Sequence, residues 1–177
     1  MQALQDLAEM VEAEVGQAHT ALTDDLTGLS NRRGLGLFGQ TVLDIGAHRK
    51  LAATLVYADL DDFKRINDSF GHGEGDRAIQ EAAELLASTF RSSDVVARVG
   101  GDEFCVLLTG AGSDEVPVSR LHAQVDSRNR SPGARYPLGF SVGRAVFDPE
   151  APLTLDELLN AADSAMYAEK RHKRAAG

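Results

Sequence analysis

The feature that most constrains this chain is a glycine-and-acid corner between two apolar runs, "RVGGDEF" at residues 98–104. The corner is preceded by VVA at residues 95–97 and followed by CVLL at residues 105–108, so both flanks resemble short buried strands. The Gly-Gly pair predicts a hairpin, because glycine tolerates the positive φ that primed turns require. Asp102 and Glu103 beside such a turn repel each other, which favours a bound cation. A solvated acidic turn is the simpler interpretation of this stretch alone.

The remaining sequence predicts helices and strands in an order typical of an α+β fold. Helical patterns run over residues 31–49, 76–90, 116–124 and 153–174. Apolar strand patterns occupy residues 51–63 and 136–147, while residues 64–76 are polar and punctuated by glycines, so no helix is expected there. The order strand, helix, hairpin, helix, strand, helix predicts a central, mostly antiparallel sheet flanked by helices, related to the ferredoxin-like arrangement.

A helical pattern also precedes this domain. Residues 1–22 are rich in Ala, Glu, Gln and Leu, with an apolar stripe at helical spacing, and predict a connector or dimerisation helix. Two interpretations are open: the helix packs on its own domain, or it pairs with a second copy and joins an upstream sensory domain. Residues 23–177 then form one globular domain.

The charge of the chain limits its partners. Eighteen Lys and Arg residues stand against 27 Asp and Glu residues, for a formal net charge of −9. This balance argues against nonspecific binding to nucleic acid and against direct membrane association. An anionic ligand would need metal ions or a local basic cluster to offset the repulsion. Cys105 is the only cysteine, so no intrachain disulfide forms. No stretch is apolar enough for a membrane span or a signal core, so we expect a cytoplasmic protein.

A second group of acids lies at the end of the first predicted strand, in "LVYADLDDF". Because strand side chains alternate, Asp59 and Asp61 point to one face and Leu60 to the other. If this strand lies beside the hairpin, Asp59 and Asp102 converge. Carboxylates with a backbone carbonyl suit Mg²⁺, which takes oxygen ligands. The chain offers no Zn²⁺ site, because it has one cysteine and its histidines lack ligand spacing.

Five stretches together resemble a known family. "RVGGDEF" is similar to the signature of the GGDEF domain, the catalytic module of diguanylate cyclases. "DDLTGLSNRR", "DLDDFKRINDSFGHGEGD", "SVGRA" and "AADSAMYAEK" agree with the same family in order and spacing. The resemblance covers residues 24–174 and implies a ferredoxin-like palm as in nucleotidyl cyclases. It also implies a reaction, in which two GTP molecules condense to cyclic di-GMP with loss of two pyrophosphates.

The resemblance implies the site residues by position. Two Mg²⁺ ions per active site, with Mn²⁺ as a substitute, would be held by the carboxylates of Asp59, Asp102 and Glu103 and by the carbonyl oxygen of Leu60. The catalytic residues would be Asp59, Lys64, Asp102 and Glu103. The substrate-binding residues would be Phe63, Asn67, His72, Asp76, Gly100, Gly101, Lys170 and Arg174. Whether Glu103 binds the second metal or accepts the hydroxyl proton stays open. Without a Cβ, the two glycines let the triphosphate approach the turn closely.

Two of these assignments have simpler alternatives. The Asp76 carboxylate can accept both N1–H and N2–H of guanine, a pair of donors that adenine lacks; the alternative is that Asp76 caps the helix that follows, and it could do both. Lys170 and Arg174 share one helix face and match residues that meet the phosphates, although basic residues also suit a helix end. The family usually has a glycine and an asparagine near this arginine. Lys173 and Ala175 stand there in this sequence, which leaves the path of the chain around Arg174 open.

A further motif, "RSSD", lies nine residues before Gly100. Arg91 and Asp94 match the family's inhibitory Arg-x-x-Asp site, which holds the product cyclic di-GMP away from the catalytic centre. Arginine suits this role because its planar fork pairs with guanine O6 and N7 and reaches phosphate. A local Arg–Asp pair at a helix end is the alternative. A second inhibitory arginine is not identified by the sequence, and Arg120 is only a candidate.

The symmetry of the product predicts a homodimer. Each domain offers one nucleotide site, whereas the product joins two nucleotides symmetrically, so two domains face each other for turnover. Two other functions remain alternatives. The domain can be a catalytically weak module that binds GTP or cyclic di-GMP for regulation, which usually shows a damaged hairpin motif. Another nucleotide cyclase or polymerase palm would share the two-metal logic but not Asn67 and Asp76 at this spacing.

Overall fold

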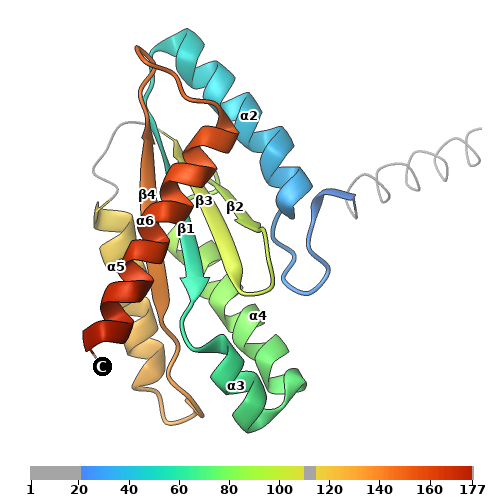
Figure 1. The fold of residues 1–177 in the computed structure, drawn as a ribbon. Coiled ribbons are helices and arrows are strands. Elements are labelled where there is room, and N and C mark those ends of the chain that lie inside the picture. The colour runs from blue at the N-terminus through green and yellow to red at the C-terminus, as the bar shows by residue number, and fades with distance from the viewer. Residues whose placement is uncertain (1–20, 110–114, 177) are drawn as a thin grey trace, which may run out of the picture.

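The structure, a computed structural model, describes residues 21–109 and 115–176, which form one four-stranded sheet with helices on both faces (Figure 1). In chain order the elements are α2 (Arg32–Arg49), β1 (Ala53–Leu60), α3 (Phe63–Phe70), α4 (His72–Thr89), β2 (Val95–Arg98), β3 (Glu103–Thr109), α5 (Glu115–Asn129), β4 (Phe140–Phe147) and α6 (Leu155–Ala176). The α+β fold class predicted from the sequence is confirmed. Most of the predicted connector helix, residues 1–20, lies outside the described residues.

The sheet has the strand order β2-β3-β1-β4, and every pairing is antiparallel. β1 is fully buried and central, so its carboxyl end lies between the hairpin strand β3 on one side and β4 on the other. In this register Asp59 pairs with Glu103 of β3 and with Ser141 of β4. The topology therefore brings acids from two separate segments to the same end of the sheet.

Alternate residues of β1 face two different helical layers. Leu55 and Tyr57 pack with α2 and α6, while Val56 and Leu60 pack with α3, α4 and α5. Figure 1 shows α6 running along the front of the sheet and α4 behind it. Because Asp59 follows Tyr57 by two residues, its carboxylate emerges on the face covered by α6.

The polar stretch 64–76 is helical, which corrects the expectation that it contains no helix. α3 covers its first half with Phe63, Ile66 and Phe70 at helical spacing, and α4 begins at His72, immediately after Gly71. Gly71 has a φ of 87°, so a glycine ends one helix and starts the next with a sharp change of direction. The suggestion that Asp76 caps α4 is therefore wrong. α5 is also longer than predicted, because it continues to Asn129.

The hairpin glycines correct a second expectation. In the described residues positive φ occurs at Gly28 and Gly71 among the glycines, and not at Gly100 or Gly101. Gly100 is needed for space, because a Cβ there would lie 2.2 Å from the Glu103 carboxylate. A Cβ on Gly101 would meet nothing within 4 Å, so the surface beside it is open. The Gly-Gly pair thus accommodates the acid that follows it and leaves room for a ligand.

No helix in residues 21–109 and 115–176 is both long and apolar enough to cross a lipid bilayer.

Candidate active site

The acids predicted to converge do meet at the end of β1. Asp59 is only 6% exposed and lies opposite Glu103 across the β1–β3 ladder. The next residue, Leu60, donates its backbone N–H to the carbonyl oxygen of Asp102 at 2.9 Å, so the hairpin corner is bound to the strand end. We call Asp59, Asp102 and Glu103 the acid cluster. Two adjacent strands therefore fix its members on a rigid base.

Burial and mutual repulsion disfavour the ionised forms of two carboxyl groups in the acid cluster. Burial raises the pKa of the Asp59 carboxyl, a hydrogen bond from Lys170 opposes that rise, and the charge of Asp102 adds to it. Burial also raises the pKa of Glu103, and the charges of Asp59, Asp102 and Asp163 raise it further. Each carboxylate therefore disfavours the ionised form of its neighbours, and a cation among them would relieve the repulsion.

The donor set of the acid cluster fits a hard divalent cation. Carboxylate oxygens and the backbone carbonyl of Leu60 are the ligand types that Mg²⁺ prefers. Within residues 21–109 and 115–176, however, no three Asp, Glu, His or Cys side chains are arranged as a metal site. The ammonium group of Lys170 binds the Asp59 carboxylate instead. The metal site therefore stays a prediction that requires the Lys170–Asp59 pair to separate.

Beyond the end of β1 lies a pocket of about 360 Å³ that we call the basic pocket. It is lined by Leu60, Asp62, Phe63, Lys64, Arg65, Asp68, Asp102, Lys170 and Arg174. The backbone starts α3 here, with Asp62 at its N-cap in the left-handed region at φ 56°. Four cationic side chains around one cavity suit a polyphosphate. The pocket thus brings six predicted site residues together, and Arg65 is a cation that the sequence analysis did not assign.

The structure settles the path of the chain around Arg174. α6 continues to Ala176, so Arg174 stays on the helix one turn after Lys170 and lines the same pocket. Lys173 explains this continuation. Its ammonium group donates to the carbonyl oxygen of Phe140 at 2.6 Å and to Asp61 Oδ2 at 3.0 Å. Sequence reasoning missed this contact, because it joins residues 112 positions apart.

The predicted guanine-binding residues lie outside the basic pocket, on the α3–α4 pair. The Asn67 side chain packs against Gly75 so closely that a Cβ on that glycine would lie 2.0 Å from Asn67 Oδ1. Asp76 follows Gly75 directly and is exposed, and His72 is exposed in the first turn of α4. The helical turn at Gly71 therefore places these polar groups on neighbouring turns of two packed helices.

A second contact missed by the sequence analysis holds the hairpin in place. The guanidinium of Arg98 binds both carboxylate oxygens of Asp24, at 3.0 and 3.1 Å, and donates to the carbonyl oxygen of Gly101 at 2.8 Å. Burial opposes ionisation of Asp24, but hydrogen bonds from Thr27 and Arg98 outweigh it and lower the pKa. The "DDLTGLSNRR" loop thus anchors the corner that carries Asp102.

The Arg-x-x-Asp motif lies at the opposite end of the hairpin from the acid cluster. The Asp94 carboxylate accepts the backbone N–H groups of Arg91 at 2.9 Å and Thr109 at 3.1 Å. In the described part of the chain, the Arg91 guanidinium makes no ion pair with Asp94, so the local-pair interpretation is not supported. Arg120 of α5 donates to the carbonyl oxygen of Thr89 at 2.7 Å, beside Arg91. The Asp94 carboxylate is therefore fixed beside Arg91, and Arg120 is bound to the Thr89 carbonyl oxygen two residues before Arg91.

A central antiparallel sheet carries acids at the end of β1 and on the β2–β3 hairpin, next to a basic pocket, and this arrangement suits a nucleotide polyphosphate. Residues 21–176 match the family described as diguanylate cyclase, GGDEF domain. The chain belongs to this GGDEF diguanylate cyclase family, and GGDEF domains of other proteins have been solved with cyclic di-GMP.

Relatives of known name support the same family. Diguanylate cyclase DgcP of Escherichia coli K12 is 34% identical over 172 residues, 94% of this chain and 49% of DgcP. Diguanylate cyclase TpbB of Pseudomonas aeruginosa UCBPP-PA14 is 37% identical over 172 residues, 94% of this chain and 39% of TpbB. The chain thus spans half or less of these relatives.

A solved structure shares the fold. The coiled coil and GGDEF domain of DgcB from Caulobacter crescentus, in complex with c-di-GMP, superposes with a TM-score of 0.87 at 24% identity. The comparison covers 97% of this chain and 92% of that chain.

Proposed function

We propose that this chain is a diguanylate cyclase that condenses two GTP molecules into cyclic di-GMP and two pyrophosphates. The observation that carries the proposal is the pairing of Asp59 with Glu103 beside the Asp102 corner, in a chain of this family. The hairpin motif is intact, whereas regulatory domains of the family usually carry a damaged one. Burial and mutual repulsion destabilise the ionised acids, and a bound cation would offset both effects.

The acid cluster and the Leu60 carbonyl would hold two Mg²⁺ ions, with Mn²⁺ as a substitute. When bound, such ions stabilise the attacking and leaving oxygens of phosphoryl transfer. Lys170 has two successive partners in this proposal: Asp59 in the free protein, and the phosphates of GTP once Asp59 binds metal. Glu103 either completes the metal shell or accepts the proton of the attacking hydroxyl.

The remaining predicted residues would bind GTP. The cations Lys64, Lys170 and Arg174 would hold the β- and γ-phosphates in the basic pocket. The open surface at Gly101 would allow close approach of the nucleotide, and Phe63 would form an apolar part of the pocket wall. Asn67 and Asp76, with His72 beside them, would read the guanine edge.

Turnover would need a two-fold homodimer, because one domain holds one GTP and the reaction joins two. Residues 1–22 would bring the copies together and connect them to an upstream sensory domain. Product inhibition would occur at Arg91 and Asp94, whose carboxylate is fixed by two backbone amides, with Arg120, which binds the Thr89 carbonyl oxygen, as the candidate second arginine. Both arginine side chains offer the guanidinium forks that recognise guanine and phosphate.

The test is incubation of the chain with GTP and Mg²⁺, followed by mass analysis of the nucleotides. We expect cyclic di-GMP from the parent protein and from an Asp126→Ala control on the exposed face of α5. The Asp102→Ala variant should yield none. Product from that variant at the parent rate would overturn the catalytic assignment. GTP binding by the parent without product would instead support the regulatory alternative, for which the Lys170–Asp59 pair offers a resting state.

A further inference from the structure

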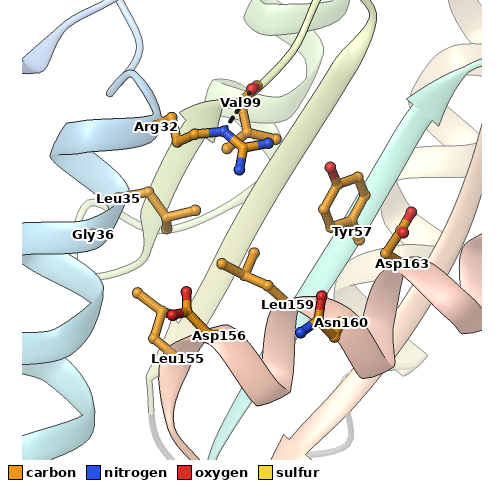
Figure 2. Close-up of a pocket in the computed structure, with 10 residues that line it drawn as sticks. All are labelled: Arg32, Leu35, Gly36, Tyr57, Val99, Leu155, Asp156, Leu159, Asn160 and Asp163. Carbon is orange, nitrogen blue, oxygen red and sulfur yellow. Dashed lines mark hydrogen bonds between the residues drawn. The ribbon is translucent and has the colours of Figure 1, made fainter.

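A second cavity opens on the same face of the sheet as the acid cluster. It lies between α2 and α6, has a volume of about 310 Å³, and contains no residue of the basic pocket (Figure 2). Tyr57 of β1 forms its floor, and we call it the α2–α6 cleft. None of the residues assigned above to metal, phosphate, guanine or product inhibition lines it.

The α2–α6 cleft combines apolar walls with fixed polar groups. Leu35, Leu155 and Leu159 line it from the two helices. Asp156, Asn160 and Asp163 follow one another along one face of α6, and Arg32 projects from the first turn of α2. The Arg32 Nε donates to the carbonyl oxygen of Val99 at 3.2 Å, and Figure 2 shows the rest of the guanidinium turned towards the cleft. Such a mixture is typical of a pocket for a small polar organic ligand.

The α2–α6 cleft lies next to the end of the sheet that carries the acid cluster. Tyr57 precedes Asp59 by two residues on the same face of β1, and its side chain is close enough to Glu103 to influence the pKa of that carboxyl. Asp163 is close enough for its charge to act on Glu103 as well. The acid cluster therefore lies between two cavities, with the basic pocket beyond the strand end and the α2–α6 cleft along the strand in the other direction.

The geometry of phosphoryl transfer assigns different roles to the two cavities. The attacking and leaving oxygens lie roughly in line on opposite sides of the phosphorus. The leaving pyrophosphate is held in the basic pocket, by Lys64, Lys170 and Arg174. With the α-phosphorus at the acid cluster, the attacking 3′-hydroxyl would approach the phosphorus from the side away from that pocket, which is the side of the α2–α6 cleft.

We propose that the α2–α6 cleft is the acceptor subsite, which takes the ribose of the GTP presented by a second copy of the chain. The proposal rests on the diguanylate cyclase function. The Asp163 carboxylate and the Asn160 amide suit ribose hydroxyls, since carboxylates commonly bind them. As the 3′-oxygen forms its bond to the α-phosphorus, the bond from phosphorus to the pyrophosphate oxygen breaks, and the hydroxyl proton passes to Glu103 or, where Glu103 binds metal, to water. The cleft orients the sugar, while the partner copy retains the guanine.

The test compares Arg32→Gln and Asn160→Leu with Arg33→Gln, a matched control that is exposed on the same turn of α2. We expect the two cleft variants to lose about 10- to 100-fold in kcat, because misplacing a reactant by little more than 1 Å costs that much. The affinity of each protomer for a non-hydrolysable GTP analogue should stay within about twofold of the parent, since the donor site is untouched. The control should keep both values. Replacing GTP by 2′-deoxy-GTP should lower the rate of the Asn160→Leu variant by a smaller factor than it lowers the rate of the parent.

Three results would overturn the acceptor subsite. The first is parent-like kcat in both cleft variants. The second is a loss of analogue affinity as large as the loss of rate, which would place the cleft in the donor site. The third is failure of the unmodified chain to make any cyclic di-GMP, which would already refute the proposed function before a variant is tested.

Discussion

Lys173 ties the last turn of α6 to the ends of two strands: its ammonium group lies 3.0 Å from Asp61 Oδ2 and 2.6 Å from the carbonyl oxygen of Phe140. Asp61 also accepts a hydrogen bond of 2.5 Å from the Ser141 hydroxyl. The family usually has glycine at the position of Lys173, so this contact distinguishes the chain. It positions Lys170 and Arg174, which lie on either side of Lys173 in sequence.

We expect Lys173→Met to raise the KM for GTP several-fold with a smaller change in kcat. The reason is that the two phosphate-binding side chains lose the contact that fixes their helix, while the acid cluster keeps its own supports. Steady-state kinetics with GTP measures the split. Lys173→Arg should restore the parent KM, because a guanidinium can reach both oxygen partners.

Lys50→Met is the matched control for this prediction. Lys50 also pairs with a carboxylate, Glu150 at 3.0 Å, but both side chains are mostly exposed and remote from the site. Such surface pairs contribute little. An equal rise of KM in the Lys50 and Lys173 variants would show that any lost lysine weakens GTP binding, and would contradict the positioning role.

Gly73 and Gly75 offer a second prediction, because a Cβ would meet very different surroundings at the two positions. A Cβ at Gly75 would lie 2.0 Å from the Asn67 amide, whereas a Cβ at Gly73 would meet nothing within 4 Å. Gly75→Ala should force the Asn67 side chain to rotate and raise the KM for GTP about tenfold, the cost of about one lost hydrogen bond. Gly73→Ala should leave KM unchanged and raise the Tm slightly, because alanine favours helix over glycine.

Gly143→Ala should act on folding instead. A Cβ there would lie 1.9 Å from the Ala162 carbonyl oxygen and 2.1 Å from the Met166 backbone nitrogen, so β4 and α6 would have to separate. Overpacking against backbone costs about 1–3 kcal/mol or more. Chemical denaturation measures the loss. A Gly143→Ala protein as stable as the parent would show that α6 can shift on the sheet.

Arg91→Ala should weaken product inhibition and leave the initial rate unchanged. The Arg91 guanidinium makes no ion pair with Asp94, so its removal costs the fold little, whereas Asp94 accepts two backbone N–H groups. Asp94→Asn should therefore lower the Tm as well as weaken inhibition. The measurement is initial rate against added cyclic di-GMP. If Arg91→Ala and Arg120→Ala were both inhibited like the parent, the product would bind elsewhere.

The sequence predicted the parts of the fold that local patterns control. The alternation in "LVYADLDDF" placed Asp59 and Asp61 on one face, where α6 meets both, and the apolar flanks of the Gly-Gly corner became β2 and β3. α3 was missed because it is short, with polar residues between its apolar positions Phe63, Ile66 and Phe70, and because a stretch with several glycines follows it. Gly71 separates α3 from α4, and the other glycines of that stretch lie within α4.

The contacts that organise the site could not be predicted from the sequence. Arg98 with Asp24, Lys173 with Asp61, and Tyr57 with Glu103 each join different elements, and no local pattern encodes those partners. The role of Gly100 was also misjudged. The sequence argument gave a positive φ and space for the triphosphate as the reasons, whereas in the structure the φ of Gly100 is not positive and the space is taken by the Glu103 side chain.

The last prediction concerns how the ionised Glu103 carboxylate affects the stability of the folded state. Burial and the neighbouring charges of Asp59 and Asp102 raise the pKa of Glu103, so the folded state disfavours its ionised form. This penalty is fully present above the raised pKa and is relieved as the pH falls through it. Glu103→Gln should therefore raise the Tm at pH 7–8 while abolishing turnover, and the gain should shrink as the pH approaches the ordinary Glu value of about 4.3. Glu84→Gln on the exposed side of α4 should change the Tm at neither pH. A lower Tm for Glu103→Gln at pH 7 would mean that the favourable influence of Tyr57 on the Glu103 carboxylate outweighs the repulsion.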